Sequence, residues 1–158
     1  MKKIVAFFSA SGTTQQIAEN LAEVAGAELY EIKPETPYTS QDLNWNNSSS
    51  RSSLEMQDKN SRPALSDKSA NISDAEIIFL GFPIWWYVAP HIINSFLESY
   101  DFSGKKIILF ATSGGSGFGE TVANLQPSAP NAKIIEGKVF RSGTDKATLK
   151  NFVDSLKL

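Results

Sequence analysis

The sequence predicts an α/β protein with a three-layer, doubly wound sheet of parallel strands, and two features of the chain support this fold class. Four short apolar runs and a fifth, weaker one recur along the 158 residues, and three of them are nearly continuous, as expected for strands that are covered on both faces. Segments with helical periodicity lie between most of these runs. This alternation of strand and helix is typical of a parallel sheet.

The five expected strands follow the apolar runs. They cover residues 4–8, 29–32, 77–82, 107–111 and 134–140. The expected helices cover residues 14–25, 90–100, 120–125 and 144–156. Gly26 and Gly104 are expected to end the helices before them, and Thr144 or Asp145 is expected to cap the last helix. We expect residues 1–158 to form one domain of this kind.

One long polar segment, residues 34–73, interrupts the alternation. It is rich in Ser and Asn, and we interpret it as a long crossover with one short helix somewhere between residues 41 and 59. Disorder of residues 46–53 is the alternative interpretation. Tyr38 and Trp45 favour packing of at least the first half of the segment.

Composition excludes several classes of function. The net charge of −2 gives no strong field for nucleic acid, and no apolar run approaches the roughly 20 residues that cross a bilayer. The chain has no cysteine and one histidine, which excludes thiolate or histidine-rich metal sites, so no metal site is predicted. The basic first residues precede too short an apolar run for a signal peptide, and a cytoplasmic location is expected.

Three unusual loops follow expected strands. Since ligands of doubly wound sheets bind beyond the carboxyl ends of the strands, these loops are the candidate site. The first is rich in hydroxyls and precedes a helix, which suits an anion; the second is aromatic; the third holds four glycines in six positions. The loops span residues 9–14, 83–90 and 112–119.

Each loop also has an ordinary structural interpretation. A Ser/Thr/Gly loop before a helix is often only a cap and a turn. Trp85, Trp86 and Tyr87 could be core or interface aromatics, although three adjacent ones cannot all face inward. The glycines could form a flexible connection. The presence of all three loops at one edge of the sheet favours a ligand site, and the absence of Lys or Arg between Lys3 and Lys33 means that neutral donors would hold any phosphate.

These residues resemble the flavodoxin family. The branch that they resemble carries a Ser-x-Ser-Gly-Thr/Asn-Thr loop, a Gly-x-Pro-Ile-Trp-Trp segment and a Ser-Gly-Gly-Ser-Gly-Phe-Gly loop. The matching stretches are residues 9–14, 81–86 and 113–119, with further similarity at 30–38 and 96–105. The resemblance runs from residue 2 to about residue 140 and is weakest in the Ser/Asn-rich middle. It implies five strands in the order 2-1-3-4-5.

The resemblance also implies a non-covalently bound FMN. The phosphate would be held by Ser9, Ser11, Gly12, Thr13 and Thr14. The isoalloxazine ring would lie along Pro83, Ile84, Trp85 and Trp86, and Ser113, Gly114, Gly115, Ser116 and Gly117 would approach its pyrimidine edge. Thr112 is also expected to bind the cofactor. The flavin would carry out the redox chemistry, so no residue is predicted to be catalytic.

Two departures from the family bear on the function. Tyr87 stands where the family often has glycine, and because positive φ is costly for Tyr, we expect poor stabilisation of one-electron-reduced flavin. The mild net charge also differs from the strongly acidic surface of typical electron carriers. The leading expectation is electron transfer with redox partner proteins.

Two other functions stay open. The first is a small FMN-dependent NAD(P)H oxidoreductase with a quinone or azo-type acceptor. The second is a non-redox module that binds a phosphate-containing ligand, because one fold hosts many activities.

Overall fold

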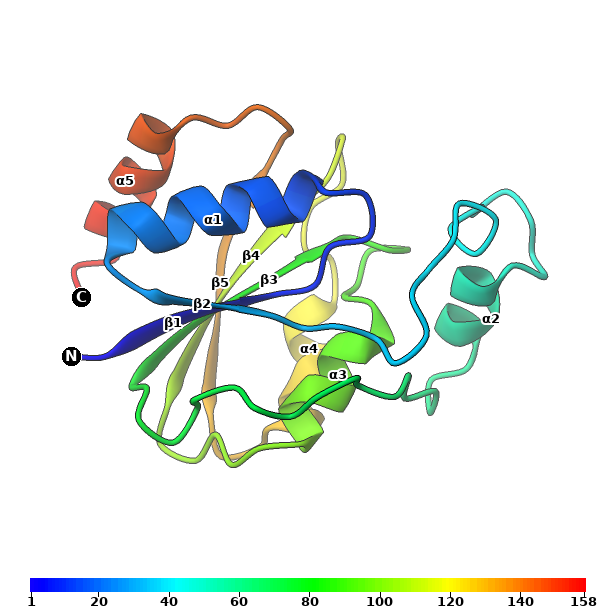
Figure 1. Cartoon of the computed structure of the whole chain (residues 1–158), viewed down its shortest axis with the longest axis horizontal. Helices are drawn as coiled ribbons and strands as arrows, with labels where there is room; N and C mark the ends of the chain where they lie inside the picture. Colours follow the sequence, from blue (N-terminus) through cyan, green and yellow to red (C-terminus); the bar gives the residue numbers. More distant parts are fainter.

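The computed structural model describes residues 1–158 and contains one five-stranded parallel sheet (Figure 1). The strand order is β2-β1-β3-β4-β5, and every neighbouring pair is parallel. The strands are β1 (Lys3–Phe7), β2 (Glu28–Glu31), β3 (Ile77–Pro83), β4 (Lys106–Thr112) and β5 (Lys133–Phe140). The expected fold class and strand order are confirmed. Eight of the ten strand ends differ from the predicted ones by a single residue, and the other two agree.

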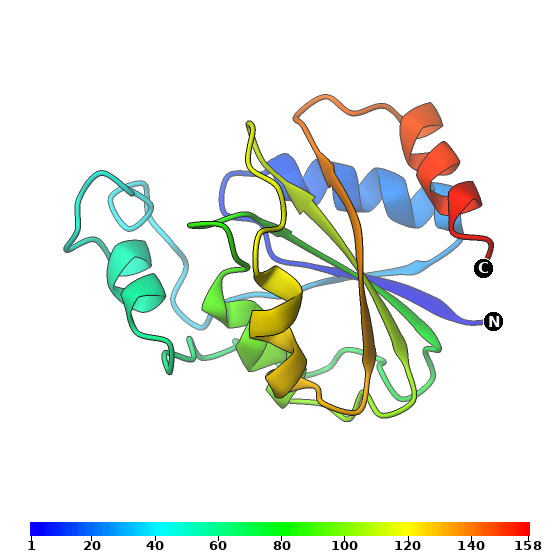
Figure 2. The ribbon, with the colours of Figure 1, turned by 180° about the vertical axis from the view of Figure 1, so that it is seen from behind.

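Helices cover both faces of the sheet (Figures 1 and 2). They are α1 (Thr13–Ala25), α2 (Arg51–Gln57), α3 (His91–Glu98), α4 (Thr121–Leu125) and α5 (Lys146–Ser155), with a 3-10 turn at Gln126–Ser128. Helices α1 and α5 lie on one face, and α3 and α4 lie on the other. Successive side chains of β1 alternate between the two cores: Val5 packs with α1 and α5, and Ile4 packs on the opposite side.

The ends of the helices mostly follow the sequence signals. Gly26 ends α1 with a φ of 63°, and the Asp145 carboxylate caps α5 by accepting a hydrogen bond from the Thr148 N–H at 2.9 Å. The expectation for Gly104 is wrong, since α3 already ends at Glu98. Gly104 instead has a φ of 75° in the turn that the Lys105 N–H closes onto the Phe102 carbonyl, and this turn provides the physical reason for a glycine.

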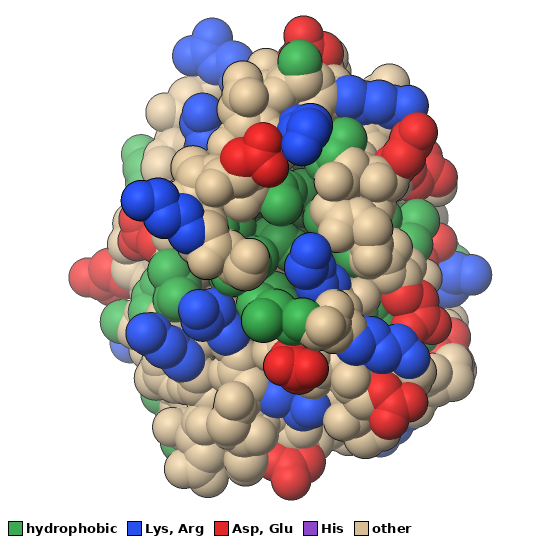
Figure 3. All heavy atoms as spheres, turned by 90° about the vertical axis from the view of Figure 1, so that its left-hand side faces the viewer, with side chains coloured by type: hydrophobic (Ala, Val, Ile, Leu, Met, Phe, Trp, Pro, Cys, Tyr) green, Lys and Arg blue, Asp and Glu red, His purple; other side chains and the backbone are tan.

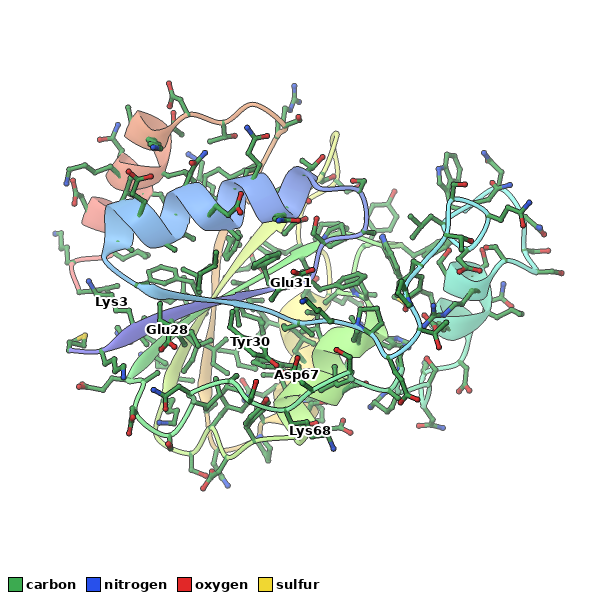
Figure 4. The ribbon with its side chains drawn as sticks, in the orientation of Figure 1. Lys3, Glu28, Tyr30, Glu31, Asp67 and Lys68 are labelled. Atoms are coloured by element: carbon green, nitrogen blue, oxygen red, sulfur yellow. The ribbon has the colours of Figure 1, made fainter.

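The crossover, residues 34–73, first projects beyond the carboxyl ends of the strands, where it carries α2, and then returns past α3 toward the amino end of β3 (Figures 1 and 2). Helix α2 lies inside the predicted range of 41–59. Tyr38 packs edge-on against Phe8 with ring centroids 5.6 Å apart, whereas Trp45 is 69% exposed, so only one of the two aromatic residues packs as expected. Farther along, the Tyr30 hydroxyl of β2 donates to the Asp67 carboxylate, which ties the last part of the crossover to the sheet (Figure 4).

Candidate functional site

A cavity of about 870 Å³ lies at the carboxyl end of the sheet. Its fourteen lining residues come from the loops after β1, β3 and β4 and from the crossover, and none of them carries a charged side chain. The volume is in the range of small-molecule and cofactor sites, about 300–1,000 Å³. The three loops that the sequence singles out therefore meet at one cavity.

The first loop presents backbone donors at the start of α1. Gly12 takes a φ of 94° as the residue before the helix, and its N–H donates to Ser9 Oγ at 3.0 Å. The neighbouring N–H groups have no acceptor within the protein; they belong to Ala10, Ser11, Thr13, Thr14 and Gln15. Five unpaired donors at the positive end of a helix dipole are suited to one anionic group.

Two buried threonines join the first loop to the third. The Thr14 and Thr112 hydroxyls form a hydrogen bond of 2.7 Å, and both residues are buried. One of the two hydroxyls donates and the other accepts, so the pair positions the loops and one O–H proton remains, together with the Thr14 backbone N–H, to donate to a ligand. The Ile84 N–H donates to the Thr112 carbonyl at 3.0 Å, which brings the segment after β3 to the same point.

Trp85 forms the boundary between the core and the cavity. Its ring lies edge-on to Phe8 and to Tyr38, with centroid distances of 5.8 and 5.5 Å. The ring also lines the cavity, as do Pro83 and Ile84. Trp85 is therefore fixed by packing before any ligand binds.

Trp86 and Tyr87 form a tight turn with an unusual backbone. The Trp85 N–H donates to the Val88 carbonyl at 2.9 Å and the Val88 N–H donates back at 3.1 Å, so the two aromatics occupy the centre of a two-residue hairpin turn. Their φ angles are 50° and 66°. Such turns normally take Asn or Gly, since positive φ costs an ordinary residue about 1–2 kcal/mol. Both rings are substantially exposed, 45% for Trp86 and 66% for Tyr87, and both residues line the cavity.

The third loop places bare backbone against the cavity. Ser113 Oγ accepts hydrogen bonds from the N–H groups of Gly115 and Ser116, at 3.2 and 2.8 Å, which curls the chain. A Cβ added at Gly114, Gly115 or Gly117 would meet nothing within 4 Å, and none of the three has a positive φ. The packing of the protein itself therefore does not require glycine at these positions, whereas a ligand lying against the backbone of Gly114 and Gly115, which line the cavity, would.

Gly119 differs from the other glycines of this loop. Its φ is 55°, and an added Cβ would lie 2.5 Å from the Tyr87 carbonyl oxygen. The third loop thus packs directly on the strained turn. Gly119 has a structural role that its three neighbours lack.

The crossover is clamped beside the cavity by a cluster around Tyr38. The Arg51 guanidinium lies 3.8 Å from the centre of the Tyr38 ring and forms a 3.0 Å ion pair with Glu55, and the Tyr38 hydroxyl donates to the same carboxylate. Burial, followed by this hydrogen bond, raises the pKa of Tyr38 far above its usual range. The phenol therefore stays protonated, and the cluster holds α2 close to Trp85.

The structure divides the predicted site residues into two groups. Those that line the cavity are Ser11, Pro83, Ile84, Trp85, Trp86, Ser113, Gly114, Gly115 and Ser116. Those in the same loops but outside the lining are Ser9, Gly12, Thr13, Thr14, Thr112 and Gly117. Sequence reasoning did not include Ala10, Leu43, Trp45, Ser52 and Tyr87 among the site residues. Ala10 and Tyr87 sit inside the predicted loops, but nothing in the sequence places the crossover residues at the cavity.

The opposite end of the sheet shows a smaller hollow. It has a volume of about 280 Å³ and is lined by Lys3 and by residues near the ends of α1 and of the chain. Figure 3 views the molecule from this side and shows apolar side chains in a shallow depression with Lys, Arg, Asp and Glu side chains around them. It lacks the unpaired helix-start donors of the first cavity, so the carboxyl end is the candidate site.

None of the helices combines the length and apolarity needed to cross a membrane.

A family model and solved structures both relate the chain to flavodoxins and flavoproteins. A family model described as Flavodoxin matches residues 2–156. The chain is 44% identical to a candidate flavoprotein from Bacteroides eggerthii, with a TM-score of 0.91 and coverage of 99% of this chain and 98% of the other. A second candidate flavoprotein, from Bacteroides uniformis, is also 44% identical, with a TM-score of 0.91 and 97% of each chain covered.

A more distant solved structure shares the fold. It is a flavoprotein in complex with FMN from Lactobacillus acidophilus, 21% identical, with a TM-score of 0.72 and 99% of each chain covered. No curated protein matches the chain.

Proposed function

This chain belongs to the flavodoxin family, and on that premise we propose that it is an FMN-binding redox protein that acts in electron transfer. The observation that carries the proposal is the set of five unpaired N–H donors at the start of α1, next to a cavity with exposed aromatic rings. FMN, when bound, supplies the redox chemistry, and the chain supplies binding and orientation.

The residues fit the two ends of FMN separately. The phosphate is matched by the helix-start N–H groups and by the hydroxyls of Ser9, Ser11 and Thr13, which need no cationic side chain. The ring is matched by the Pro83–Trp86 segment, which offers apolar and indole surface, and by the Gly114–Gly115 backbone. The Lactobacillus flavoprotein of the same fold was solved with FMN, which supports this assignment.

A second function is favoured by a specific observation. The cavity extends beyond the three loops to Leu43, Trp45 and Ser52 of the crossover, so it offers surface for a second molecule beside the flavin. A pocket over the flavin favours two-electron chemistry, as in a small NAD(P)H-dependent oxidoreductase. The mild net charge of −2 points in the same direction.

One experiment tests the proposal and separates its two forms. The purified protein is loaded with FMN and reduced anaerobically, once with dithionite and once with NADPH, while the visible spectrum is recorded. Reduction by dithionite alone supports a carrier that exchanges electrons with partner proteins, and rapid bleaching by NADPH supports the oxidoreductase. A protein that stays colourless after FMN addition and gel filtration contradicts both and favours the non-redox module.

A further inference from the structure

We infer that the cavity contains, beside the FMN site, a subsite for an uncharged planar aromatic molecule, with Trp45 of the crossover as its outer wall. The inference rests on the proposed function, because it takes the loops after β1, β3 and β4 as the FMN site. Leu43, Trp45 and Ser52 line the same cavity and come from none of these loops. These three residues form a wall of the cavity that is not part of the assigned FMN site.

The chemistry of the lining selects the class of ligand. The fourteen lining residues include no Lys, Arg, Asp, Glu or His. With FMN bound at the helix-start donors, a charged group beside Leu43, Trp45 and Ser52 would lose its water and find neither a counter-ion nor those N–H groups, which is unfavourable. An uncharged flat ring loses little hydration and gains contact with the indole rings.

Trp45 has no evident structural role to explain its position. It is 69% exposed, and it is absent from the apolar side chains that pack on either hydrophobic core. Trp86, which is 45% exposed, lines the same cavity from the turn after β3. Two exposed indoles at one uncharged cavity are typical of a surface that binds a ligand.

The wall is held in place before a ligand arrives. Trp45 lies in a turn that the Asn47 N–H closes onto the Asn44 carbonyl at 3.1 Å. The Ser52 N–H donates to the Asp42 carbonyl at 3.0 Å, and Asp42 exchanges hydrogen bonds with Thr39 at 2.9 and 3.1 Å. A preorganised wall lowers the ordering cost of binding.

The test measures two ligands on the same variants. FMN affinity is determined first, from the quenching of flavin fluorescence. Menadione, an uncharged naphthoquinone, and a sulfonated naphthoquinone are then titrated calorimetrically into the oxidised, FMN-loaded protein, so that no reaction is needed. We expect menadione to bind one-to-one and the sulfonate at least about tenfold more weakly, because its charge finds no partner in the cavity.

The variants locate the subsite. Trp45→Ala should weaken menadione binding by about tenfold or more, the order expected for the loss of one stacked ring, and leave FMN affinity within about twofold of the wild type. Trp45→Phe should restore most of the menadione binding. The matched control is Leu54→Ala, which removes an exposed apolar side chain of the same crossover that does not line the cavity, and it should change neither affinity.

Three results would overturn the inference. If Trp45→Ala weakens FMN as much as menadione, Trp45 covers the flavin, and the proposed function stands without this subsite. If menadione and the sulfonate bind equally, or if Trp45→Ala leaves menadione binding intact, the uncharged subsite is refuted. Failure of the wild type to bind FMN in the first titration contradicts the proposed function itself, before any quinone is added.

Discussion

Replacing single glycines of the loop after β4 by alanine tests whether a bound ligand is the reason for glycine at those positions. A Cβ at Gly114 has open space within the protein, and its φ is not positive. Gly114→Ala should therefore fold normally, with an unfolding free energy that is unchanged or raised by up to about 1 kcal/mol. The added methyl should weaken FMN binding by about tenfold or more, since it would push the ring away from the backbone. Chemical denaturation and fluorescence titration measure the two effects.

Gly119→Ala provides the contrast for this prediction. Here the new Cβ would meet the Tyr87 carbonyl oxygen at 2.5 Å with φ at 55°, so we expect destabilisation by more than about 1 kcal/mol. A Gly114→Ala protein that keeps wild-type FMN affinity would show that the flavin does not approach this backbone.

The strained turn makes a second prediction at the level of the residue. Tyr87 holds a φ of 66° and is 66% exposed, so replacing it by Gly or by Ala removes a similar amount of side chain contact. Gly tolerates positive φ and Ala does not, and Tyr87→Gly should therefore be about 1 kcal/mol more stable than Tyr87→Ala. Thermal and urea unfolding of both variants measure the difference. Equal stability would mean that the turn is not in this conformation in solution.

At the level of elements, Ser61 of the crossover is joined by a hydrogen bond to His91 of α3, and we call this contact the latch. Ser61 Oγ donates to the Glu55 carbonyl at 2.6 Å and lies 2.6 Å from His91 Nδ1, so the Nδ1–H of the imidazole donates to the hydroxyl. Burial lowers the pKa of His91 below its usual value of 6.5, with a further contribution from the Arg62 guanidinium. Glu55 and Asp58 oppose the shift. The folded protein therefore favours the neutral imidazole.

This latch makes stability depend on pH in a defined direction. Because the unfolded chain takes up a proton on His91 more readily than the folded protein, His91 contributes stability above pH 6.5 that is lost as the pH falls from 6.5 toward the lower folded-state pKa. His91 is the sole histidine, so His91→Asn should remove this part of the dependence. Urea unfolding as a function of pH measures it. Identical slopes below pH 6.5 for the two proteins would contradict the assignment.

How far the sequence predicts an element depends on which contacts define it. The apolar runs locate β1, β3 and β4 well, because strands buried on both faces show their burial in composition alone. The placement of Trp45 at the cavity depends on distant contacts, such as Tyr38 against Phe8, that leave no periodic signal. The tight turn at Trp86 and Tyr87 is likewise hidden, because the sequence lacks the Asn or Gly that usually marks such a turn.

For the whole molecule, the parallel sheet is what brings the site together. The carboxyl ends of β1, β3 and β4 lie side by side, so loops separated by about 70 and 30 residues along the chain meet at one cavity. The order of the strands and the place of the three loops could be predicted from sequence. The pairing of Thr14 with Thr112, which joins two of these loops, could not, because two hydroxyls 98 residues apart give no local signal.

The proposed FMN site depends on a loop of neutral donors for the phosphate, and comparison of FMN with riboflavin tests this loop most directly. Riboflavin has the same ring and side chain without the phosphate. We predict one-to-one binding of FMN, riboflavin binding at least about tenfold weaker because the helix-start donors stay unpaired, and partial recovery of that loss when inorganic phosphate is added. Ser11→Ala should weaken FMN and leave riboflavin unchanged. Equal affinities for FMN and riboflavin would contradict the phosphate site and, with it, the proposed cofactor.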